Sequence, residues 1–313
     1  MTTFRLTEDT RQALHCAATI GFFDGVHLGH VYVIDQLRRY AQARGLRSAL
    51  ITFDRHPRQV IDDSWQPQQL STLEQKEELL RLRGVDYLVV LPFGEQMAQL
   101  SAYAFMRDVL GAQLGVEMLL TGYDNRFGHR AVGSSEGFED YVRYGKELGI
   151  EVVCGQPLMM DGQAVSSSRI RRLLAAGRVD EAALCLGRPY GLQGQVVSGE
   201  HVGRQMGFPT ANLSTLGQMS PGSGVYAVKV ALAGEKTLYQ GVTNIGKRPT
   251  FGVHQTTVET YILDFHRQIY GEQITLLFIK RLRDEQLFDS PDALARQMTT
   301  DVSHARMILN ENL

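Results

Sequence analysis

The 313-residue chain has only three cysteines, Cys16, Cys154 and Cys185, which lie far apart and form no C-x-x-C pair. Their number and spacing indicate neither a zinc site nor a disulfide framework, and they favour reduced thiols. No apolar run approaches the ~20 residues that a membrane-spanning helix requires. The first residues also lack the apolar core of a signal peptide. We therefore expect a cytoplasmic protein without a membrane partner.

A strongly basic surface is missing as well. The net charge is −2, and the basic and acidic residues of each half nearly balance. A nucleic-acid partner therefore gains no support, and phosphate ligands would have to be bound by local arginines and backbone amides. The remaining composition, 43% hydrophobic and 21% charged, is typical of a soluble globular protein. The length favours two domains.

Short apolar strands alternate with amphipathic helices through the first 185 residues. Strands are expected at 47–53, 85–91, 116–121 and 151–154, and the helices between them at 31–44, 71–83, 101–110 and 137–148. This alternation predicts an α/β domain with a parallel, doubly wound, Rossmann-like sheet. Ligands of such sheets bind at the carboxyl ends of the strands, where His27, His56 and Asp124 are expected.

The pattern changes near residues 185–190. Segments 191–197, 224–231, 258–264 and 274–280 are rich in β-branched and aromatic residues and are separated by glycine-containing turns. They predict an antiparallel β-barrel. Ser290-Pro291 then begins a terminal helix that extends to about Leu309. We expect two domains, 1–185 and 186–313.

The segment from Thr19 to His30 joins an apolar strand to a helix. Its glycines permit tight turns and close approach of a ligand, and the helical period that follows places His27 and His30 at a helix N-terminus. Free N–H groups and the helix dipole make such a terminus an anion site. Both rings could contact one phosphate chain. A metal-binding pair and a polar helix start remain alternatives.

A second candidate phosphate element begins at Ser166. Three consecutive serines precede Arg169 and Arg171 at the start of another expected helix. Hydroxyl groups, helix N–H groups and guanidinium groups together suit a phosphate. The alternative is an N-cap followed by a solvated basic turn.

These segments resemble a known family. The H-x-G-H of residues 27–30 resembles the nucleotidyltransferase signature, and the longer T-x-G-x-F-D-G-x-H-x-G-H resembles the adenylyltransferase half of bacterial bifunctional riboflavin kinase/FAD synthetases. Residues 52–57, 122–128 and 165–171 resemble three further elements of that half. The resemblance implies that ATP lies across the H-x-G-H turn and that the serine–arginine element closes on its phosphates. Arg55 replaces a proline that is common in the family, which leaves that loop less rigid.

The resemblance also assigns roles to individual residues of the first half. It implies catalytic roles for His27, His30 and Arg171. ATP and phosphate contacts are implied for Gly21, Phe22, Asp24, Gly25, Gly29, Ser167, Ser168 and Arg169. Flavin contacts are implied for His56, Pro57, Asp124, Asn125 and Arg126.

In the second half, residues 203–213 resemble the riboflavin kinase signature G-R-x-x-G-F-P-T-A-N, and four later blocks follow in the family's order. The resemblance implies ATP and Mg²⁺ contacts from Gly203, Arg204, Gly207, Pro209, Thr210 and Asn212. Thr210 and Asn212 offer neutral oxygens that suit a Mg²⁺ ion bridging ATP phosphates. An ordinary turn after Pro209 is the alternative.

The two implied reactions need different groups. The FMN phosphate carries nearly two negative charges and can attack the ATP α-phosphorus without a base, so the enzyme must align and neutralise anions with its histidines, arginines and Mg²⁺. Riboflavin presents a neutral hydroxyl, for which a carboxylate base is useful, and Glu259 is the candidate. Glu259 could instead face solvent on an exposed strand.

We therefore expect a bifunctional enzyme that converts riboflavin to FMN and FMN to FAD, with ATP as co-substrate and Mg²⁺ at each step. Riboflavin, FMN and ATP are the expected partners, and the protein is expected to be a monomer or to self-associate weakly. An aminoacyl-tRNA synthetase would require a lysine-rich loop where this chain has Ser166-Ser-Ser-Arg169. A non-catalytic flavin sensor would show no turnover.

Overall fold

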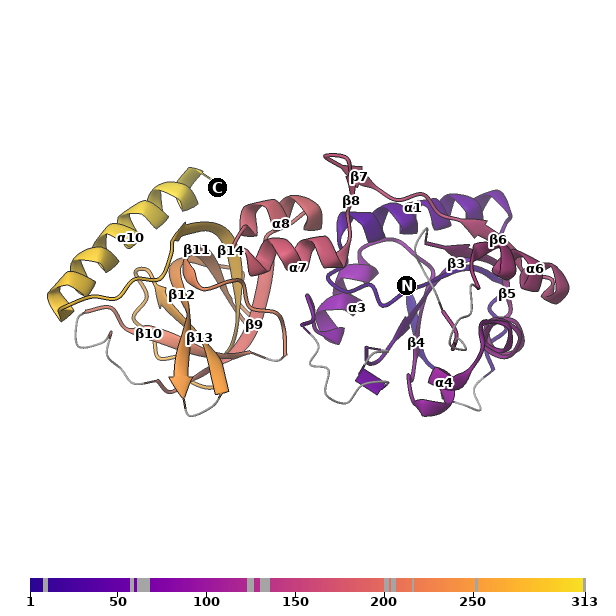
Figure 1. Ribbon diagram of the computed structural model, residues 1–313, viewed down its shortest axis with the longest axis horizontal. Helices are drawn as coiled ribbons and strands as arrows, with labels where there is room; N and C mark the ends of the chain where they lie inside the picture. Colours follow the sequence, from indigo (N-terminus) through magenta and orange to yellow (C-terminus); the bar gives the residue numbers. More distant parts are fainter. Residues whose placement is uncertain are drawn as a thin grey trace. The chain divides into compact units, whose positions relative to one another are not determined.

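The computed structural model describes residues 1–7, 11–56, 59–60, 68–122, 127–129, 136–199, 203, 207–215, 217–250 and 253–311; the side chains of 247–250 and 253–255 are outside the description. The chain forms two compact units (Figure 1). Met1–Pro67 and Leu73–Val165 make the first, and Gln68–Thr72 and Ser166–Leu313 make the second. The chain therefore passes between the units three times.

A six-stranded sheet in the order β1-β4-β3-β2-β5-β6 forms the centre of the first unit, and every neighbouring pair is parallel. The expected parallel α/β fold is confirmed. The strands are β1 (Thr2–Arg5), β2 (Cys16–Ile20), β3 (Arg47–Phe53), β4 (Tyr87–Leu91), β5 (Val116–Thr121) and β6 (Glu151–Cys154). A small hairpin follows, with β7 (Met159–Met160) and β8 (Gln163–Ala164).

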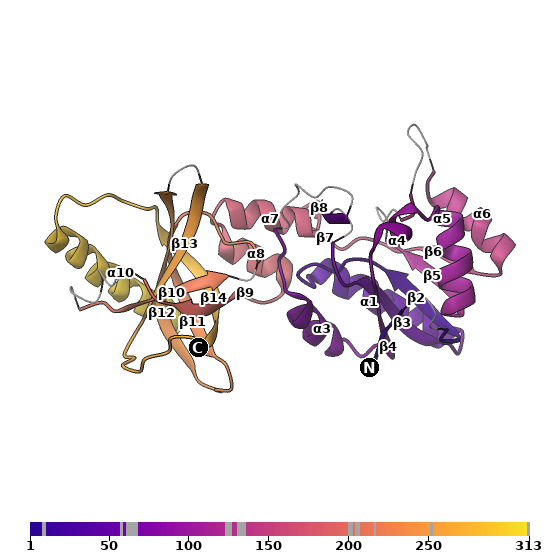
Figure 2. The ribbon, with the colours of Figure 1, turned by 90° about the horizontal axis from the view of Figure 1, so that it is seen from below.

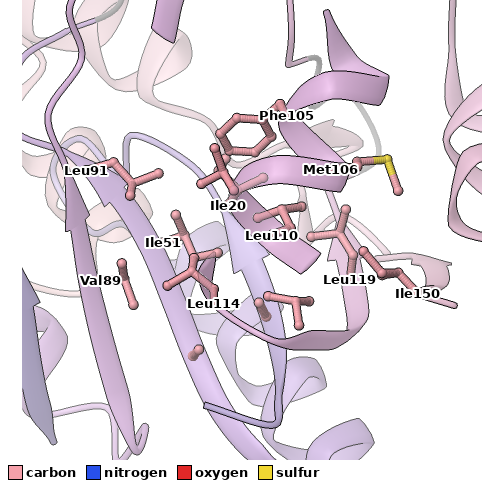
Figure 3. Packing of buried hydrophobic residues seen from close by; sticks show 14 of the residues in the cluster. Ile20, Ile51, Val89, Leu91, Phe105, Met106, Leu110, Leu114, Leu119 and Ile150 are labelled. Carbon is pink, nitrogen blue, oxygen red and sulfur yellow. The ribbon is translucent and has the colours of Figure 1, made fainter. Parts of the chain in front are cut away.

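Helices cover both faces of this sheet (Figure 2). The helices are α1 (Leu28–Ala43), α3 (Leu73–Arg81), α4 (Glu95–Gln99), α5 (Ala102–Ala104), the π-helix η1 (Phe105–Gln113) and α6 (Phe138–Leu148). Successive residues of β3 pack into opposite layers: Leu50 lies against α1 and α3, whereas Ile51 lies against η1. Figure 3 shows Phe105, Met106 and Leu110 of η1 over the sheet. Burial on both faces explains the largely apolar sequences of the four inner strands, β2, β3, β4 and β5.

The second unit is built around a closed antiparallel barrel in the order β10-β13-β12-β11-β14-β9. The expected barrel and terminal helix are therefore confirmed. The strands are β9 (Tyr190–Val197), β10 (Thr210–Thr215), β11 (Gly224–Leu232), β12 (Leu238–Thr250), β13 (Val253–Ile262) and β14 (Gln273–Arg283). The terminal helix α10 (Pro291–Glu311) packs Ala305 and Leu309 against Ala227 of the barrel.

Two helices precede the barrel and belong to its unit: α7 (Ser167–Ala175) and α8 (Val179–Leu186). Asp180 of α8 pairs with Lys280 of β14. The segment Gln68–Thr72 also lies in this unit, where the backbone of Gln69 bridges to Gln218 and the Gln218 amide donates to the Leu70 carbonyl. The functional boundary expected between residues 185 and 186 remains a prediction.

All three cysteines are free thiols, and Cys16 and Cys185 are buried. Burial, followed by the nearby Glu117 carboxylate, raises the pKa of Cys16 to about 12, so this thiol is unreactive. Within the described part of the chain, each helix is too short or too polar to cross a bilayer.

Candidate active sites

The turn between β2 and α1 holds the two histidines of the H-x-G-H motif. His27 is the N-cap of α1, and its Nδ1 accepts a hydrogen bond of 3.2 Å from the backbone N–H of His30. A neutral imidazole that accepts at Nδ1 carries its proton on Nε2. The cap therefore fixes the tautomer of His27, with the ring proton on Nε2.

The two histidine rings stack with centroids 3.6 Å apart and an interplanar angle of 18°. Burial, followed by the proximity of His27 and Lys76, lowers the pKa of His30 well below its ordinary value. His30 is therefore neutral near pH 7 and can act as a hydrogen-bonding group but not as a cation. Its Nδ1 atom is buried and has no hydrogen-bond partner among the described residues.

The turn is tightly constrained. A Cβ on Gly29 would collide with the carbonyl oxygen of Val165, so only glycine fits there. Phe23, Gly25 and Val26 all have positive φ, at 52°, 76° and 39°. A β-branched residue such as Val26 adopts this conformation only when its surroundings impose it. The fold thus holds the backbone close to where a ligand would bind.

The structure brings a second predicted element to this turn. The ring of His56, which follows β3, packs against the Phe22 ring in a T-shaped arrangement with centroids 4.7 Å apart. Arg55, at the position of the usual proline, is exposed and lies 3.8 Å from the Asp54 carboxylate. The remaining predicted flavin contacts, Pro57, Asp124, Asn125 and Arg126, lie outside the described residues.

Lys76 of α3 is a site residue that the sequence reasoning missed. Its side chain is 3% exposed, and its Nζ donates to the Phe22 carbonyl (3.1 Å), the Thr52 hydroxyl (3.1 Å) and the Phe53 carbonyl (3.3 Å). The ammonium also lies 4.2 Å from the centre of the Phe22 ring. The available sequence signal was its spacing of four from Leu80, which places both on the buried face of the helix.

The serine–arginine element begins the second unit. Ser166 is the N-cap of α7 and accepts from the backbone N–H of Arg169 at 3.3 Å, so one of the three hydroxyls has the capping role of the alternative interpretation. Ser167 and Ser168 form the first turn of the helix, and Arg171 donates to the Gln68 carbonyl at 2.9 Å. Ser166 directly follows Val165, whose carbonyl lies beside Gly29.

In the barrel, Glu259 of β13 lies directly opposite Asn212 of β10 and Asn244 of β12. Glu259 is half-buried and lines a cavity of about 380 Å³ beneath α10. The cavity wall combines polar and apolar side chains, among them Thr210, Asn244, Arg283, Leu287, Phe288 and Met298. Glu259 therefore faces a cavity, unlike the outward-facing residue of the alternative interpretation.

A second cavity of about 330 Å³ shares Thr210 with the first. Its wall includes Pro209, Phe265, His266, Arg267 and Tyr270. Thr210 and Asn212 lie in β10 and pair with β13, so they are strand residues and do not form an ordinary turn. Gly203 lines the first cavity, Gly207 has a positive φ of 83°, and Arg204 lies outside the described residues.

The oxygen atoms that Thr210 and Asn212 offer as metal ligands suit a magnesium ion bound chiefly through ATP. The described residues contain no cluster of three or more His, Cys, Asp or Glu side chains that could hold a metal by themselves. Thr210 and Asn212 supply hydroxyl and amide oxygens, and a Cβ on Gly199 would collide with the Asn212 amide. Mg²⁺ commonly binds through few protein oxygens together with water and substrate phosphates.

Comparisons with known proteins match both units. The FAD synthetase family model matches residues 9–169, and the riboflavin kinase family model matches residues 186–309. A protein of Escherichia coli (strain K12) named bifunctional riboflavin kinase/FMN adenylyltransferase is 37% identical, over 93% of this chain and 92% of its own length. One of the same name from Listeria monocytogenes is 37% identical, over 96% of this chain and 95% of its own.

A solved structure from Streptococcus pneumoniae, titled a macrolide-efflux protein, is also similar. It covers 98% of this chain and 99% of its own, with a TM-score of 0.85 and 29% identity. Family membership rests on the two family models and the near full-length relatives, which agree with one another. The chain belongs to the bifunctional riboflavin kinase/FMN adenylyltransferase family, as an enzyme with a FAD synthetase half and a riboflavin kinase half.

Proposed function

We propose that the turn containing His27 and His30 is the site of adenylyl transfer to FMN, and that the cavity beside Glu259 is the site of riboflavin phosphorylation. Each reaction uses ATP. The observation that carries the proposal is the separation of two kinds of chemistry: a helix N-terminus with neutral histidine donors in one unit, and a carboxylate in a cavity in the other.

In adenylyl transfer, a phosphate oxygen of FMN attacks the α-phosphorus of ATP and pyrophosphate leaves. Both reactants are anions, so the principal requirement is alignment and stabilisation of charge. The Nε2–H of His27 and the free N–H groups at the start of α1 donate to the phosphoryl oxygens. His30 adds a neutral hydrogen-bonding ring without the desolvation cost of a buried cation.

The positive charge of this site is assigned to Arg169 and Arg171, with Ser167 and Ser168 as phosphate donors. The assignment rests on the resemblance of residues 165–171 to the family's serine–arginine element, and Ser166 caps the helix that carries these residues. The rings of His56 and Phe22 pack against each other in a T-shaped arrangement, and both are proposed as contacts of the flavin.

In riboflavin phosphorylation, the terminal hydroxyl of the ribityl chain attacks the γ-phosphorus of ATP and ADP leaves. Glu259 accepts the hydroxyl proton as the new O–P bond forms. Thr210 and Asn212 would hold Mg²⁺, which neutralises charge on the ATP phosphates when bound. The apolar wall formed by Leu287, Phe288 and Met298 suits the isoalloxazine ring, whereas Arg267 and His266 of the adjoining cavity suit a nucleotide.

Chromatographic separation of flavins tests both reactions with the intact chain. Riboflavin, ATP and MgCl₂ should give FMN followed by FAD, and FMN with ATP and MgCl₂ should give FAD directly. Omission of MgCl₂ in the presence of EDTA should stop both reactions. Appearance of no new flavin would contradict the proposal.

A cytoplasmic location and a monomeric or weakly associating state are part of the same proposal, and size-exclusion chromatography tests the latter.

A further inference from the structure

We propose that Lys76, as its ammonium, is a positioning residue of the adenylyl transfer site that joins the H-x-G-H turn to the end of β3. The inference rests on the proposed function of that turn. Lys76 comes from α3, a helix that carries none of the motif residues, and its ammonium donates to three neutral oxygen atoms.

The contacts show what the ammonium holds. A lysine ammonium has three N–H donors. Here they meet three acceptors, namely the carbonyl oxygens of Phe22 and Phe53 and the hydroxyl of Thr52. Thr52 in turn donates to the Phe22 carbonyl at 3.3 Å. A neutral amine has one donor fewer and could not satisfy all three acceptors.

The three acceptors of the Lys76 ammonium lie in two segments that adjoin the proposed site, namely the turn before His27 and the end of β3. Phe22 lies in the turn that leads to His27, and Phe53 is the last residue of β3, three residues before His56. The Phe22 ring contacts Lys76 on one side and the His56 ring on another. One buried cation therefore positions both the phosphate side and the proposed flavin side of the site.

Burial lowers the pKa of Lys76 from 10.5 to about 8, against the opposing effect of Asp24, Glu77 and Asp54. Asp24 belongs to the H-x-G-H turn, Asp54 follows β3, and Glu77 is the neighbour of Lys76 on α3. His30 is the titratable group that faces it from α1, and it is neutral. The ammonium predominates below pH 8 and is lost above it, within a range where enzymes can be assayed.

The first test is the pH dependence of the unmodified enzyme. FAD formation from FMN should fall above pH about 8 with the slope of one proton, while riboflavin phosphorylation in the same preparation keeps a different profile. A flat rate of FAD formation between pH 7 and 9.5 would overturn the inference. Absence of FAD formation at every pH would instead refute the proposed function of the turn.

Two variants then assign the titration to Lys76. Lys76→Met should lower kcat/KM for FMN by about 10- to 100-fold at pH 7, because the H-x-G-H turn and the end of β3 are no longer aligned. The same substitution should abolish the fall in FAD formation above pH 8. Thr52→Val keeps the side-chain shape but removes one acceptor, so it should move the loss of activity to lower pH. The matched control is Lys146→Met, at an exposed position of α6, which should behave as the parent.

Folding is monitored by near-ultraviolet circular dichroism, and kinase activity of the same chains provides an internal standard. A folded Lys76→Met enzyme with parental kcat/KM would overturn the inference. So would a Thr52→Val enzyme whose pH profile is unchanged, and this variant decides the question if Lys76→Met does not fold.

Discussion

Glu259 and Asn244 lie directly opposite each other on β13 and β12, and both line the cavity beneath α10. Glu259→Gln keeps the size of the side chain but removes its basicity. Riboflavin phosphorylation should therefore fall by about 10²–10⁴-fold, the usual contribution of a general base. FAD formation from FMN should remain near the parental rate. Initial rates with each flavin measure both effects.

Glu181→Gln is the matched control for this change, because it removes an exposed carboxylate of the same unit. It should leave both reactions unchanged. If Glu259→Gln phosphorylates riboflavin at the normal rate, Glu259 lines the cavity but is not the general base. Failure of both reactions together would show that the two activities are coupled.

The two roles of His27 can be separated by substitution. His27→Ala removes both the N-cap and the Nε2–H donor, so it should cost about 1 kcal/mol of stability and lower the rate of FAD formation about 10²–10³-fold. His27→Asn retains a capping oxygen and should recover stability but not activity. The double substitution of His27 and His30 by alanine should be at least as damaging. Near-normal FAD formation in that variant would refute the anion-site role.

Gly29→Ala tests the close approach of the turn to Val165. The added Cβ would collide with the Val165 carbonyl oxygen, so the backbone must shift and FAD formation should fall at least tenfold. Gly94→Ala is the control, because that position has open space around an added Cβ and an ordinary φ of −110°. Equal rates of FAD formation in the two variants would contradict the tight geometry described for the turn.

A buried ion pair in the wall of the cavity beside Glu259 joins β14 to α10. Arg283 contacts both oxygens of Asp301 at 2.8–3.1 Å, and Gln297 donates to the same carboxylate at 2.9 Å. Asp301→Ala leaves a buried arginine unpaired and should destabilise the unit by about 3–5 kcal/mol. The exposed pair between Arg306 and Asp264 provides the control, since Asp264→Asn removes the charge at a positive-φ position that asparagine tolerates and should cost about 0–1 kcal/mol. Urea unfolding of the two variants measures the difference.

A fragment comparison tests the predicted boundary. Residues 186–313 contain the complete barrel and α10, and we predict that they fold and phosphorylate riboflavin. Residues 166–313 also contain α7 and α8, including Asp180, the partner of Lys280, and should be more stable. Thermal unfolding and kinase assays of both fragments provide the comparison. Insolubility of both would count against an autonomous kinase unit.

Much of the architecture was predictable because packing dictates hydrophobic patterning. Continuous apolar strands separated by amphipathic helices led correctly to the parallel sheet, and short β-branched segments led to the barrel. The family and its two activities were also predicted correctly from the motifs. The strand Thr2–Arg5 was missed because two of its residues are exposed at the edge of the sheet.

Other features depend on contacts that a linear pattern does not show. The helix expected at 101–110 begins as α5 and continues as a π-helix to Gln113, a difference in hydrogen-bond register that leaves little trace in residue spacing. Lys76 escaped notice because a lysine in a helix usually faces solvent. Its contacts with both Phe22 and Phe53 form only because the ends of β2 and β3 lie side by side in the folded sheet.

The assignment of Gln68–Thr72 to the second unit has a consequence for cleaved forms of the enzyme. Cutting the peptide bond between Val165 and Ser166 would leave this segment on the N-terminal fragment but embedded among residues of the C-terminal one. There Met219 donates its backbone N–H to the Gln69 carbonyl, and the Gln218 amide donates to Leu70. A nicked enzyme would thus remain a non-covalent complex, and we expect two separately produced fragments divided at this bond to associate by inserting this five-residue segment beside Gln218 and Met219.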